Sequence, residues 1–278
     1  HFSDRISILP LVDDRGHLVA IATRDRGGFR IGPFSIDQKS PVFVIAEIGI
    51  NHNGDMKLAK QMIHKAKYAG ADCVKFQMRD MKSLYRNHDN SKTAVNEDLG
   101  AQYVLDLLRK FQLSNEQMYE LFDECKSIDV LPLCTPWDLS SLDALETYGM
   151  DGYKVASADL TNHELLKAMA KTGKPLIVST GMSMEDEIQQ SIKILNTEGA
   201  SYALLHCNST YPAPFKDIHL NYMKRLQELG DCPVGYSGHE RGYVIAIAAV
   251  AQGATIIEKH FTLDKNMEGN DHKVSLLP

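Results

Sequence analysis

The stretch VFVIAEIGINHNGD (residues 42–55) contains the structural unit that the rest of the chain repeats. The apolar, β-branched run at 42–49 predicts a buried strand, because short runs of this kind bounded by Gly and polar residues are typical of strands. Asp55 predicts the start of a helix, since its side-chain oxygen can accept hydrogen bonds from free backbone N–H groups. The helical pattern that follows continues to Ala69 and ends at Gly70, a residue that commonly terminates helices.

The same strand-and-helix unit recurs along the chain. Seven further runs predict strands at residues 71–77, 129–135, 152–157, 175–180, 202–207, 232–237 and 254–260. Amphipathic segments separate them, with helix starts expected at Ser114, Asn162 and Ser183. Eight strands alternating with helices predict an α/β fold, the closed (β/α)8 TIM barrel. We disfavour the alternative, an open doubly wound sheet, because no Gly-rich phosphate-binding turn follows the first strand.

Two regions interrupt the alternation. Residues 79–113 form a long polar excursion after the second strand, and long excursions on barrels are usually lids or mobile segments. Residues 1–41 precede the first barrel strand and contain two expected β-hairpins, one across DDRG and one within FRIGPFSI. We therefore divide the chain into an N-terminal segment, 1–28, and a barrel, 29–278.

Composition excludes several classes of protein. The 278 residues are 44% hydrophobic, enough for one large core, and the net charge of −6 is spread without a basic stripe for nucleic acid. No apolar run reaches the roughly 18 residues that a membrane span requires, and no signal peptide is visible. The five cysteines lack C-x-x-C spacing, which favours a reducing compartment over a disulfide framework. We expect a cytoplasmic protein that binds neither nucleic acid nor membrane.

Polar residues gather where the expected strands end, the position of active sites in TIM barrels. Lys75 and Lys154 lie on two different strands, and burying a lysine without a partner is costly. With the hydroxyl groups of Thr135, Ser157 and Ser179 nearby, the two lysines predict a cradle for an anion. A structural ion pair is the alternative for either lysine taken alone.

Two histidines stand out because both fall at the mouths of neighbouring strands. His239 and His260 are neutral imidazoles with Glu47 and Asp271 in reach, a combination that suits a divalent ion. Two nitrogens plus oxygens resemble a six-coordinate Mn²⁺ site more than a closed tetrahedral zinc site. His206 lies within a strand and is expected in the core.

Seven short motifs, taken in order, resemble those of the sialic acid synthase family. They read AEIGINHNGD (46–55), KFQ (75–77), KVAS (154–157), STGM (179–182), HC with YP (206–207 and 211–212), SGH (237–239) and EKHF (258–261). The match covers about residues 29–278. Residues 1–26 instead resemble the end of a CBS-type regulatory module.

The resemblance implies a transferase that condenses phosphoenolpyruvate with an open-chain N-acyl hexosamine, giving a nine-carbon 2-keto acid and phosphate. The implied sugar is N-acetylmannosamine or 2,4-diacetamido-2,4,6-trideoxymannose. The second is implied because Asn208-Ser209-Thr210-Tyr211 resembles the branch that makes legionaminic acid. The resemblance also implies a homodimer, with Mn²⁺ or another divalent ion such as Mg²⁺ or Co²⁺ at His239 and His260.

The resemblance and the strand-end positions together give each polar residue an expected role. Catalytic roles fall to Glu47, Lys75, Gln77, Lys154 and Glu258. Contacts with the substrates fall to Thr135, Ser157, Asp159, Ser179, Ser209, Tyr211, Ser237 and Asp271. Glu47 is the expected base for the attacking water, and Trp137 is expected to serve packing.

Other functions stay open at this point. A Schiff-base aldolase would use Lys75 or Lys154, and a related heptulosonate synthase or a non-catalytic, ligand-binding barrel would also fit. In the family the sequence pattern continues beyond position 278 with an eighth helix and an antifreeze-like domain. An arginine of that domain contacts the sugar bound in the partner subunit. We therefore expect weak sugar binding by this chain. The outer faces of the eighth and first strands should be apolar at Val44 and at Ile256 or Ile257, and we expect the N-terminal segment, a neighbouring chain or residues beyond 278 to cover them.

Overall fold

Eight parallel strands form the centre of the molecule in a computed structural model that describes residues 8–13, 15–23, 28–84 and 99–278. The strands are β5 (Phe43–Gly49), β6 (Cys73–Met78), β7 (Leu131–Pro136), β8 (Tyr153–Val155), β9 (Leu176–Ser179), β10 (Tyr202–Cys207), β11 (Val234–Gly238) and β12 (Ile256–His260). They pair in the order β7-β6-β5-β12-β11-β10-β9-β8, and β7 contacts β8. This contact closes the sheet, so the TIM barrel is confirmed and the open sheet is wrong.

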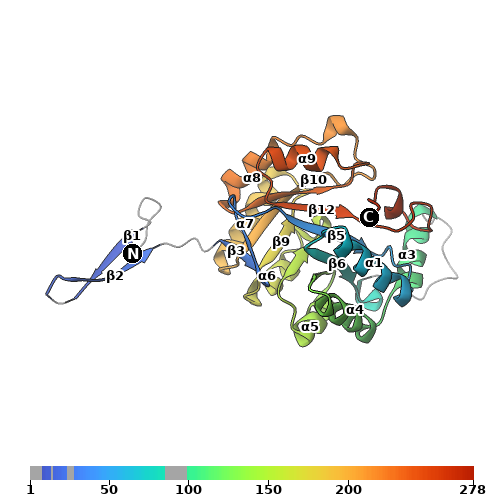
Figure 1. Ribbon diagram of the computed structural model, residues 1–278, viewed down its shortest axis with the longest axis horizontal. Helices are drawn as coiled ribbons and strands as arrows, with labels where there is room; N and C mark the ends of the chain where they lie inside the picture. Colours follow the sequence, from blue (N-terminus) through green and yellow to red (C-terminus); the bar gives the residue numbers. More distant parts are fainter. Residues whose placement is uncertain (1–7, 14, 24–27, 85–98) are drawn as a thin grey trace.

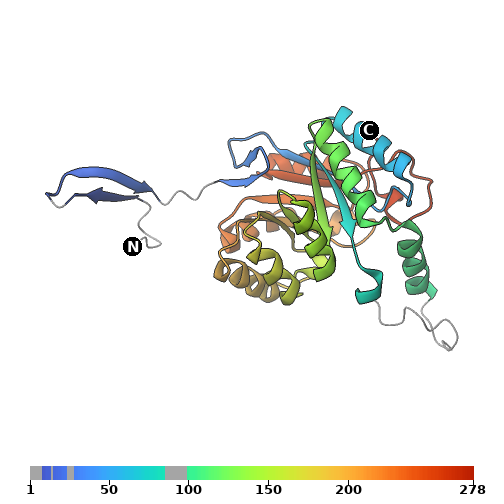
Figure 2. The same cartoon turned by 90° about the horizontal axis from the view of Figure 1, so that it is seen from below.

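Helices surround the strands (Figures 1 and 2). They are α1 (Met56–Tyr68), α4 (Asn115–Ser127), α5 (Leu139–Tyr148), α6 (His163–Lys171), α7 (Glu185–Thr197), α8 (Tyr222–Gly230) and α9 (Val244–Ala251). Asp55, Ser114 and Asn162 cap α1, α4 and α6 as predicted, each accepting a hydrogen bond from a backbone N–H. Helix α7 begins slightly later than predicted, because Met184 and not Ser183 occupies the N-cap position.

Both predicted hairpins are present before the barrel. Strands β1 (Ile8–Val12) and β2 (Leu18–Thr23) form a separate antiparallel sheet, and the division of the chain near residue 28 stays a prediction. Strands β3 (Phe29–Ile31) and β4 (Phe34–Ile36) form the second hairpin. Its apolar side chains join those inside the barrel, so this hairpin closes the end at which the strands begin.

The inward-facing side chains change character along each strand, because alternate residues of a strand point to the same face. The inner cluster at the closed end is apolar and consists of Phe29, Ile31, Ile36, Phe43, Ile45, Cys73, Leu131, Leu133, Ile177, Ala203, Leu205 and Ile256. Two residues further along, the inward positions hold buried charges such as Glu47 on β5, Lys75 on β6 and Glu258 on β12. The polar residues therefore lie together at the open end.

The excursion after β6 contains more regular structure than its sequence predicted. It includes helices α2 (Met81–Leu84) and α3 (Leu99–Phe111), with residues 85–98 outside the described part. The prediction of a loop is therefore wrong for α2 and α3. Leu107 of α3 is buried, so this helix is packed onto the barrel and not held away from it.

After β12 the chain forms no further α-helix in residues 261–278, where the 3-10 turn η3 (Asp271–Lys273) is the main regular element. Of the outer-face positions that were predicted to be apolar and covered, Ile257 is only 6% exposed, whereas Val44 is 38% exposed. Ile256 points into the barrel. None of the helices in the described ranges is both long and apolar enough to cross a membrane.

Candidate active site

A cavity of about 400 Å³ opens at the carboxyl ends of the barrel strands. Its wall includes every site residue that the sequence predicted except Asp159: Glu47, Lys75, Gln77, Thr135, Lys154, Ser157, Ser179, Ser209, Tyr211, Ser237, His239, Glu258, His260 and Asp271. Asp159 lies in the short turn η1 (Ser157–Asp159) beyond the wall, where it accepts a hydrogen bond from Asn162. Polar groups from all eight strands or the segments that follow them therefore converge on a space large enough for small substrates.

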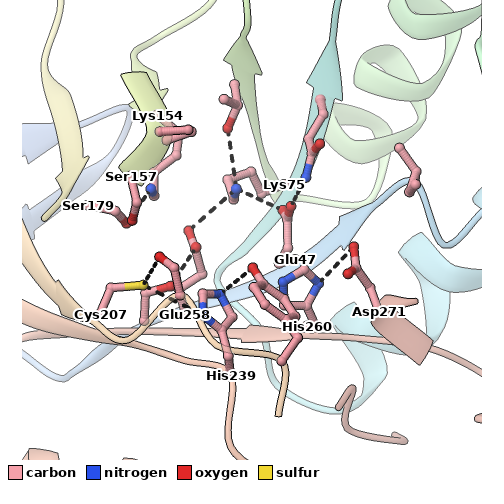
Figure 3. Close-up of a pocket in the computed structure, with 18 of the residues that line it drawn as sticks. Glu47, Lys75, Lys154, Ser157, Ser179, Cys207, His239, Glu258, His260 and Asp271 are labelled. Carbon is pink, nitrogen blue, oxygen red and sulfur yellow. Dashed lines mark hydrogen bonds and ion pairs between the residues drawn. The ribbon is translucent and has the colours of Figure 1, made fainter. Parts of the chain in front are cut away.

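Lys75 lies between two buried carboxylates (Figure 3). Its Nζ is 3.0 Å from Glu47 Oε2 and 3.7 Å from Glu258 Oε2, and it donates to Thr135 Oγ1 at 3.3 Å. Burial alone would lower the pKa of Lys75, but the two carboxylates outweigh burial and raise it. The reverse holds for Glu258: burial favours its neutral form, yet Lys154 and Lys75 hold its pKa below the usual value. These groups therefore form a charged cluster at neutral pH.

Lys154 lies in a different environment, although both lysines face the same cavity. It is only 2% exposed, and its Nζ donates to Ser179 Oγ at 2.6 Å and to the Val155 carbonyl at 2.8 Å. In the described part of the chain no carboxylate lies within 4.0 Å of this ammonium group. Burial lowers its pKa to about 8. Lys154 is therefore the cation that most needs an incoming anion.

Hydroxyl groups complete this side of the cavity. A Cβ on Gly181 would lie 2.5 Å from Ser209 Oγ and 2.8 Å from Ser157 Oγ, so only glycine lets these two serines approach the same backbone. Ser237 donates to Glu258 Oε1 at 3.0 Å. Two ammonium groups with several hydroxyl groups match the oxygen atoms of a phosphate or a carboxylate.

Glu47 is fixed at both of its oxygens. Oε2 faces Lys75, and Oε1 accepts a hydrogen bond from Gln77 Nε2 at 2.7 Å. The pair lies directly over Gly49, whose φ is +55° and whose Cβ, if present, would be 2.9 Å from Glu47 Oε1. Glycine at this position therefore supplies both the backbone conformation and the space that the pair needs.

The two histidines lie beside each other, with ring centroids 5.4 Å apart. His239 Nδ1 is 2.6 Å from the Asn208 carbonyl, which can only accept, so Nδ1 carries the proton and Nε2 is left to accept from the Tyr211 hydroxyl at 2.7 Å. His260 Nδ1 is buried, has no hydrogen-bond partner in the part of the chain that the structure describes, and lies 3.8 Å from Asp271 Oδ2. Burial lowers the pKa of His260 and outweighs the effect of Asp271, so the ring is neutral at pH 7.

These features fit a divalent ion. Imidazole nitrogens are common metal ligands, and the buried His260 Nδ1 has no hydrogen-bond partner among the described residues, with the Asp271 carboxylate beside it. The described residues contain no group of three or more His, Cys, Asp or Glu side chains that could hold an ion on their own. An ion held by two imidazoles would keep open positions for water and substrate, as catalytic metal sites do.

The two asparagines that follow β5, Asn51 and Asn53, bind the C-terminal segment of the chain. Asn51 donates to Ser275 Oγ at 3.0 Å, and Asn53 Oδ1 pairs with His272 Nε2 at 3.1 Å. Both therefore anchor the C-terminal segment that carries Asp271 to the mouth of the barrel. His206 is buried in a strand as expected.

The cavity wall also contains residues that the sequence interpretation missed. Trp137, for which packing was the default expectation and a place in the wall the alternative, lines the cavity. Arg79 and Cys207 line it as well. The period-two alternation that links Lys75 and Gln77 also places Arg79 on their face, so this residue could have been found.

Other wall residues carried no such signal. Leu107 and Leu108 reach the cavity from α3, and Ile50 and Met182 from strand-end loops. Their place depends on how α3 packs, which no local pattern specifies. They add an apolar patch to a cavity that is otherwise rich in charge.

A protein-family model described as the NeuB family matches residues 62–278. The N,N'-diacetyllegionaminic acid synthase of Campylobacter jejuni is 43% identical over 243 residues, which are 84% of this chain and 72% of that protein. The human N-acetylneuraminate-9-phosphate synthase is 35% identical over 239 residues, 86% of this chain and 67% of that protein.

The solved structures contain the same fold. The N-acetylneuraminic acid (sialic acid) synthetase from Leptospira borgpetersenii, in complex with citrate, superposes with a TM-score of 0.82. It is 32% identical in sequence, and the superposition covers 90% of this chain and 83% of that one. The similarity therefore includes the barrel and the strand ends that form the cavity.

Proposed function

The chain belongs to the NeuB family, and from that premise we propose that it is a transferase that condenses phosphoenolpyruvate with an N-acyl amino sugar. The products are a nine-carbon 2-keto acid of the sialic type and inorganic phosphate. The observation that carries the proposal is the pairing of a dianion cradle, Lys75 and Lys154, with two neighbouring histidines in one cavity. Relatives that are named as synthases of this class support it.

In the proposed reaction the two lysines hold phosphoenolpyruvate. Lys154, which has no carboxylate within 4.0 Å among the described residues, takes the phosphate, together with the hydroxyls of Ser157 and Ser179. Lys75, with Thr135, lies where the carboxylate would be. Lysine suits this task because it is a compact charge with three donors.

The proposed bond changes are those of an aldol-type condensation followed by hydration. The methylene carbon of phosphoenolpyruvate attacks the sugar aldehyde, and the aldehyde oxygen takes up a proton. Water then adds to the carbon that bears the phosphate and gives one proton to Glu47, which balances the proton taken up by the aldehyde oxygen. When phosphate leaves by carbon–oxygen cleavage, it takes the remaining proton of that water, and the ketone forms. Alignment of the two substrates in one cavity could lower the barrier by about 7–11 kcal/mol.

We also propose that His239 and His260 hold the metal, with Mn²⁺ as the first choice and Mg²⁺ or Co²⁺ as alternatives. A bound divalent ion would act as a Lewis acid on the aldehyde oxygen and orient the sugar. Asp271, anchored next to His260, would contact a sugar hydroxyl.

For the sugar we favour 2,4-diacetamido-2,4,6-trideoxymannose over N-acetylmannosamine. The apolar patch formed by Ile50, Leu107, Leu108 and Met182 would accept acetyl and deoxy methyl groups. The identity to a legionaminic acid synthase, 43%, supports the same choice.

The test is an assay with phosphoenolpyruvate, Mn²⁺ and each of three sugars: N-acetylmannosamine, its 6-phosphate and the diacetamido sugar. We expect phosphate release together with a nine-carbon keto acid, fastest with the diacetamido sugar. K75M should abolish both products, whereas K174M removes a lysine paired with Glu146 away from the cavity and should not. Binding of phosphoenolpyruvate without a keto acid from any sugar would favour a non-catalytic, ligand-binding barrel.

One observation favours a second candidate, a Schiff-base aldolase. Lys154 has a pKa of about 8 and could act as a nucleophilic amine near neutral pH. Borohydride treatment in the presence of pyruvate would trap such an adduct. We expect no mass increase on Lys154, and a stable adduct there would replace the synthase proposal with the aldolase.

Two further proposals concern the setting of the enzyme. We propose a homodimer, because α9 exposes Tyr243, Val244 and Ile247, and exposed apolar patches often mark interfaces. Sedimentation of the purified chain would measure this state. We place the reaction in the cytoplasm, since all five cysteines are free thiols, as is usual in reducing compartments.

A further inference from the structure

We propose that Arg79 and Trp137 are positioning residues that act on Glu47 through Gln77. They fix the side-chain amide of Gln77 so that its nitrogen, and not its oxygen, faces the Glu47 carboxylate. The kinetic part of this inference rests on the proposed function, whereas the structural part does not.

The amide of Gln77 lies between groups of opposite hydrogen-bonding type. On one side its nitrogen donates to Glu47 Oε1 at 2.7 Å. On the other side its oxygen accepts from an Arg79 guanidinium nitrogen at 2.6 Å and from the Trp137 indole Nε1 at 3.3 Å. An ionised carboxylate only accepts, and guanidinium and indole N–H groups only donate. One orientation of the amide satisfies all three partners, and the reversed orientation satisfies none.

Arg79 is itself held in place by several parts of the fold. Its carbonyl accepts from Gln112 Nε2 at 3.0 Å, and the N–H of the next residue, Asp80, donates to Asp138 Oδ2 at 2.7 Å. The guanidinium group lies over the Trp137 ring, 4.9 Å from the ring centroid, a cation–π contact. The end of β6, the segment after β7 and the segment after α3 therefore all define its position.

This arrangement fixes the carboxylate proposed as the base. Glu47 forms an ion pair with Lys75 at one oxygen and accepts a hydrogen bond from Gln77 at the other. Without Arg79 the Gln77 amide can rotate, and its oxygen would then repel Glu47 Oε1. We expect the catalytic rate to suffer more than the binding of phosphoenolpyruvate, because Lys75 and Lys154 remain in place.

A double-mutant cycle tests whether Arg79 acts through Gln77. R79M should lower kcat by about 10- to 100-fold, as loss of an outer partner of an active-site group commonly does, with little change in KM for phosphoenolpyruvate. In a Q77M background the same R79M change should lower kcat by less than about threefold. R79K keeps a donor and should recover part of the loss, and W137F keeps a ring under Arg79 but removes one donor. R225M is the matched control: it removes an exposed arginine of α8 that pairs with Glu185 of α7, and it should leave kcat unchanged.

A second readout needs no turnover. The side-chain amide signal of Gln77 in a ¹⁵N NMR spectrum can be assigned by its absence from Q77M. In R79M this signal should shift and exchange faster with solvent, while R225M leaves it in place.

Two outcomes would overturn the proposal. An equal loss of kcat from R79M with and without Gln77 would mean that Arg79 acts independently, and a rise in KM for the sugar alone would mean that it binds substrate directly. An unchanged Gln77 signal in R79M would contradict the positioning role whatever the kinetics. If no sugar supports turnover, the proposed function fails, while the NMR result still decides this inference.

Discussion

The two ends of the barrel are built from the same eight strands yet have opposite chemistry. At the closed end the inward residues are apolar, as Ile45 on β5 and Ile256 on β12 illustrate. Two positions further along the same strands they are charged, as Glu47 and Glu258. A shift of two residues keeps the face and changes the environment, so a strand can serve the core and the site at once.

The difference has consequences for stability. Apolar burial at the closed end, reinforced by the β3–β4 hairpin, stabilises the barrel. The open end buries two lysines and two glutamates, and buried charges need partners to be tolerated. We therefore expect substitutions at the closed end to affect folding and those at the open end to affect binding and chemistry, with Lys75 as a defined exception.

Substitution of Lys75 should give the largest effect, because it should lower both the stability and the activity of the protein. K75M leaves Glu47 and Glu258 buried without their shared cation, which should destabilise the protein by about 3–5 kcal/mol. Activity should fall on the order of a thousandfold. K154M is the comparison: among the described residues no carboxylate lies within 4.0 Å of Lys154, although its charge helps to keep Glu258 ionised, so K154M should weaken phosphoenolpyruvate binding with a smaller loss of stability than K75M. Urea denaturation and calorimetric titration measure the two quantities, and equal stability of K75M and the unaltered protein would contradict the ion-pair account.

A substitution at the closed end should show the opposite separation. Ile31 is 1% exposed, and I31A should cost about 2–5 kcal/mol in the free energy of unfolding through the cavity it leaves. The kcat and KM of the folded protein should stay unchanged. L139A, at a position that is 41% exposed at the start of α5 and outside the proposed interface, truncates a side chain of the same size and should cost clearly less than I31A. A large change in kcat for I31A would break the distinction between the two ends.

The histidine pair offers a test confined to the open end. H239A and H260A should each weaken Mn²⁺ binding by at least about 100-fold, since each removes one of two imidazole ligands. H64A, on the outer surface of α1, is the control and should bind Mn²⁺ normally. Electron paramagnetic resonance of free Mn²⁺ measures these affinities. Normal binding by both site variants would remove the metal from this position.

The smallest expected effect is a pH dependence caused by Lys154. Its pKa is lowered to about 8, so the amine is mainly charged below pH 8 and loses its proton as the pH rises through that value. Phosphoenolpyruvate is an anion and prefers the charged form, so its affinity should fall by up to about tenfold between pH 7 and pH 9. Binding at pH 8 should be accompanied by proton uptake. A fall in affinity that persists in K154M would assign the effect to another group.

The contrast between the two ends also explains what could be predicted from sequence. The eight strands followed from short apolar runs, and the site followed from polar residues at their ends, because in a parallel barrel all strand ends meet. What could not be predicted was which buried charges lie next to each other. Lys75 and Lys154 look alike in sequence, but only the pairing of β12 with β5, the neighbour of β6, brings Glu258 close to Lys75. Lys154 receives no carboxylate within 4.0 Å in the described chain.

Packing of the long excursion was equally beyond local patterns. Helix α3 places Leu107 and Leu108 in the cavity wall, and no periodic signal links them to the strand ends. Asn51 and Asn53 belong to the first of the seven motifs, AEIGINHNGD, yet they bind the C-terminal segment and do not line the cavity. A motif can thus be predicted to matter before the contacts that give it a role are known.

The most direct test of the proposed reaction follows one oxygen atom. Phosphoenolpyruvate labelled with ¹⁸O at the oxygen that bridges carbon and phosphorus is incubated with the protein, Mn²⁺ and the diacetamido sugar, and both products are weighed by mass spectrometry. The account predicts that the label leaves in the phosphate, because water adds to carbon and the carbon–oxygen bond breaks. Label retained in the keto acid, or no keto acid at all, would contradict the account of the open end as a condensing site.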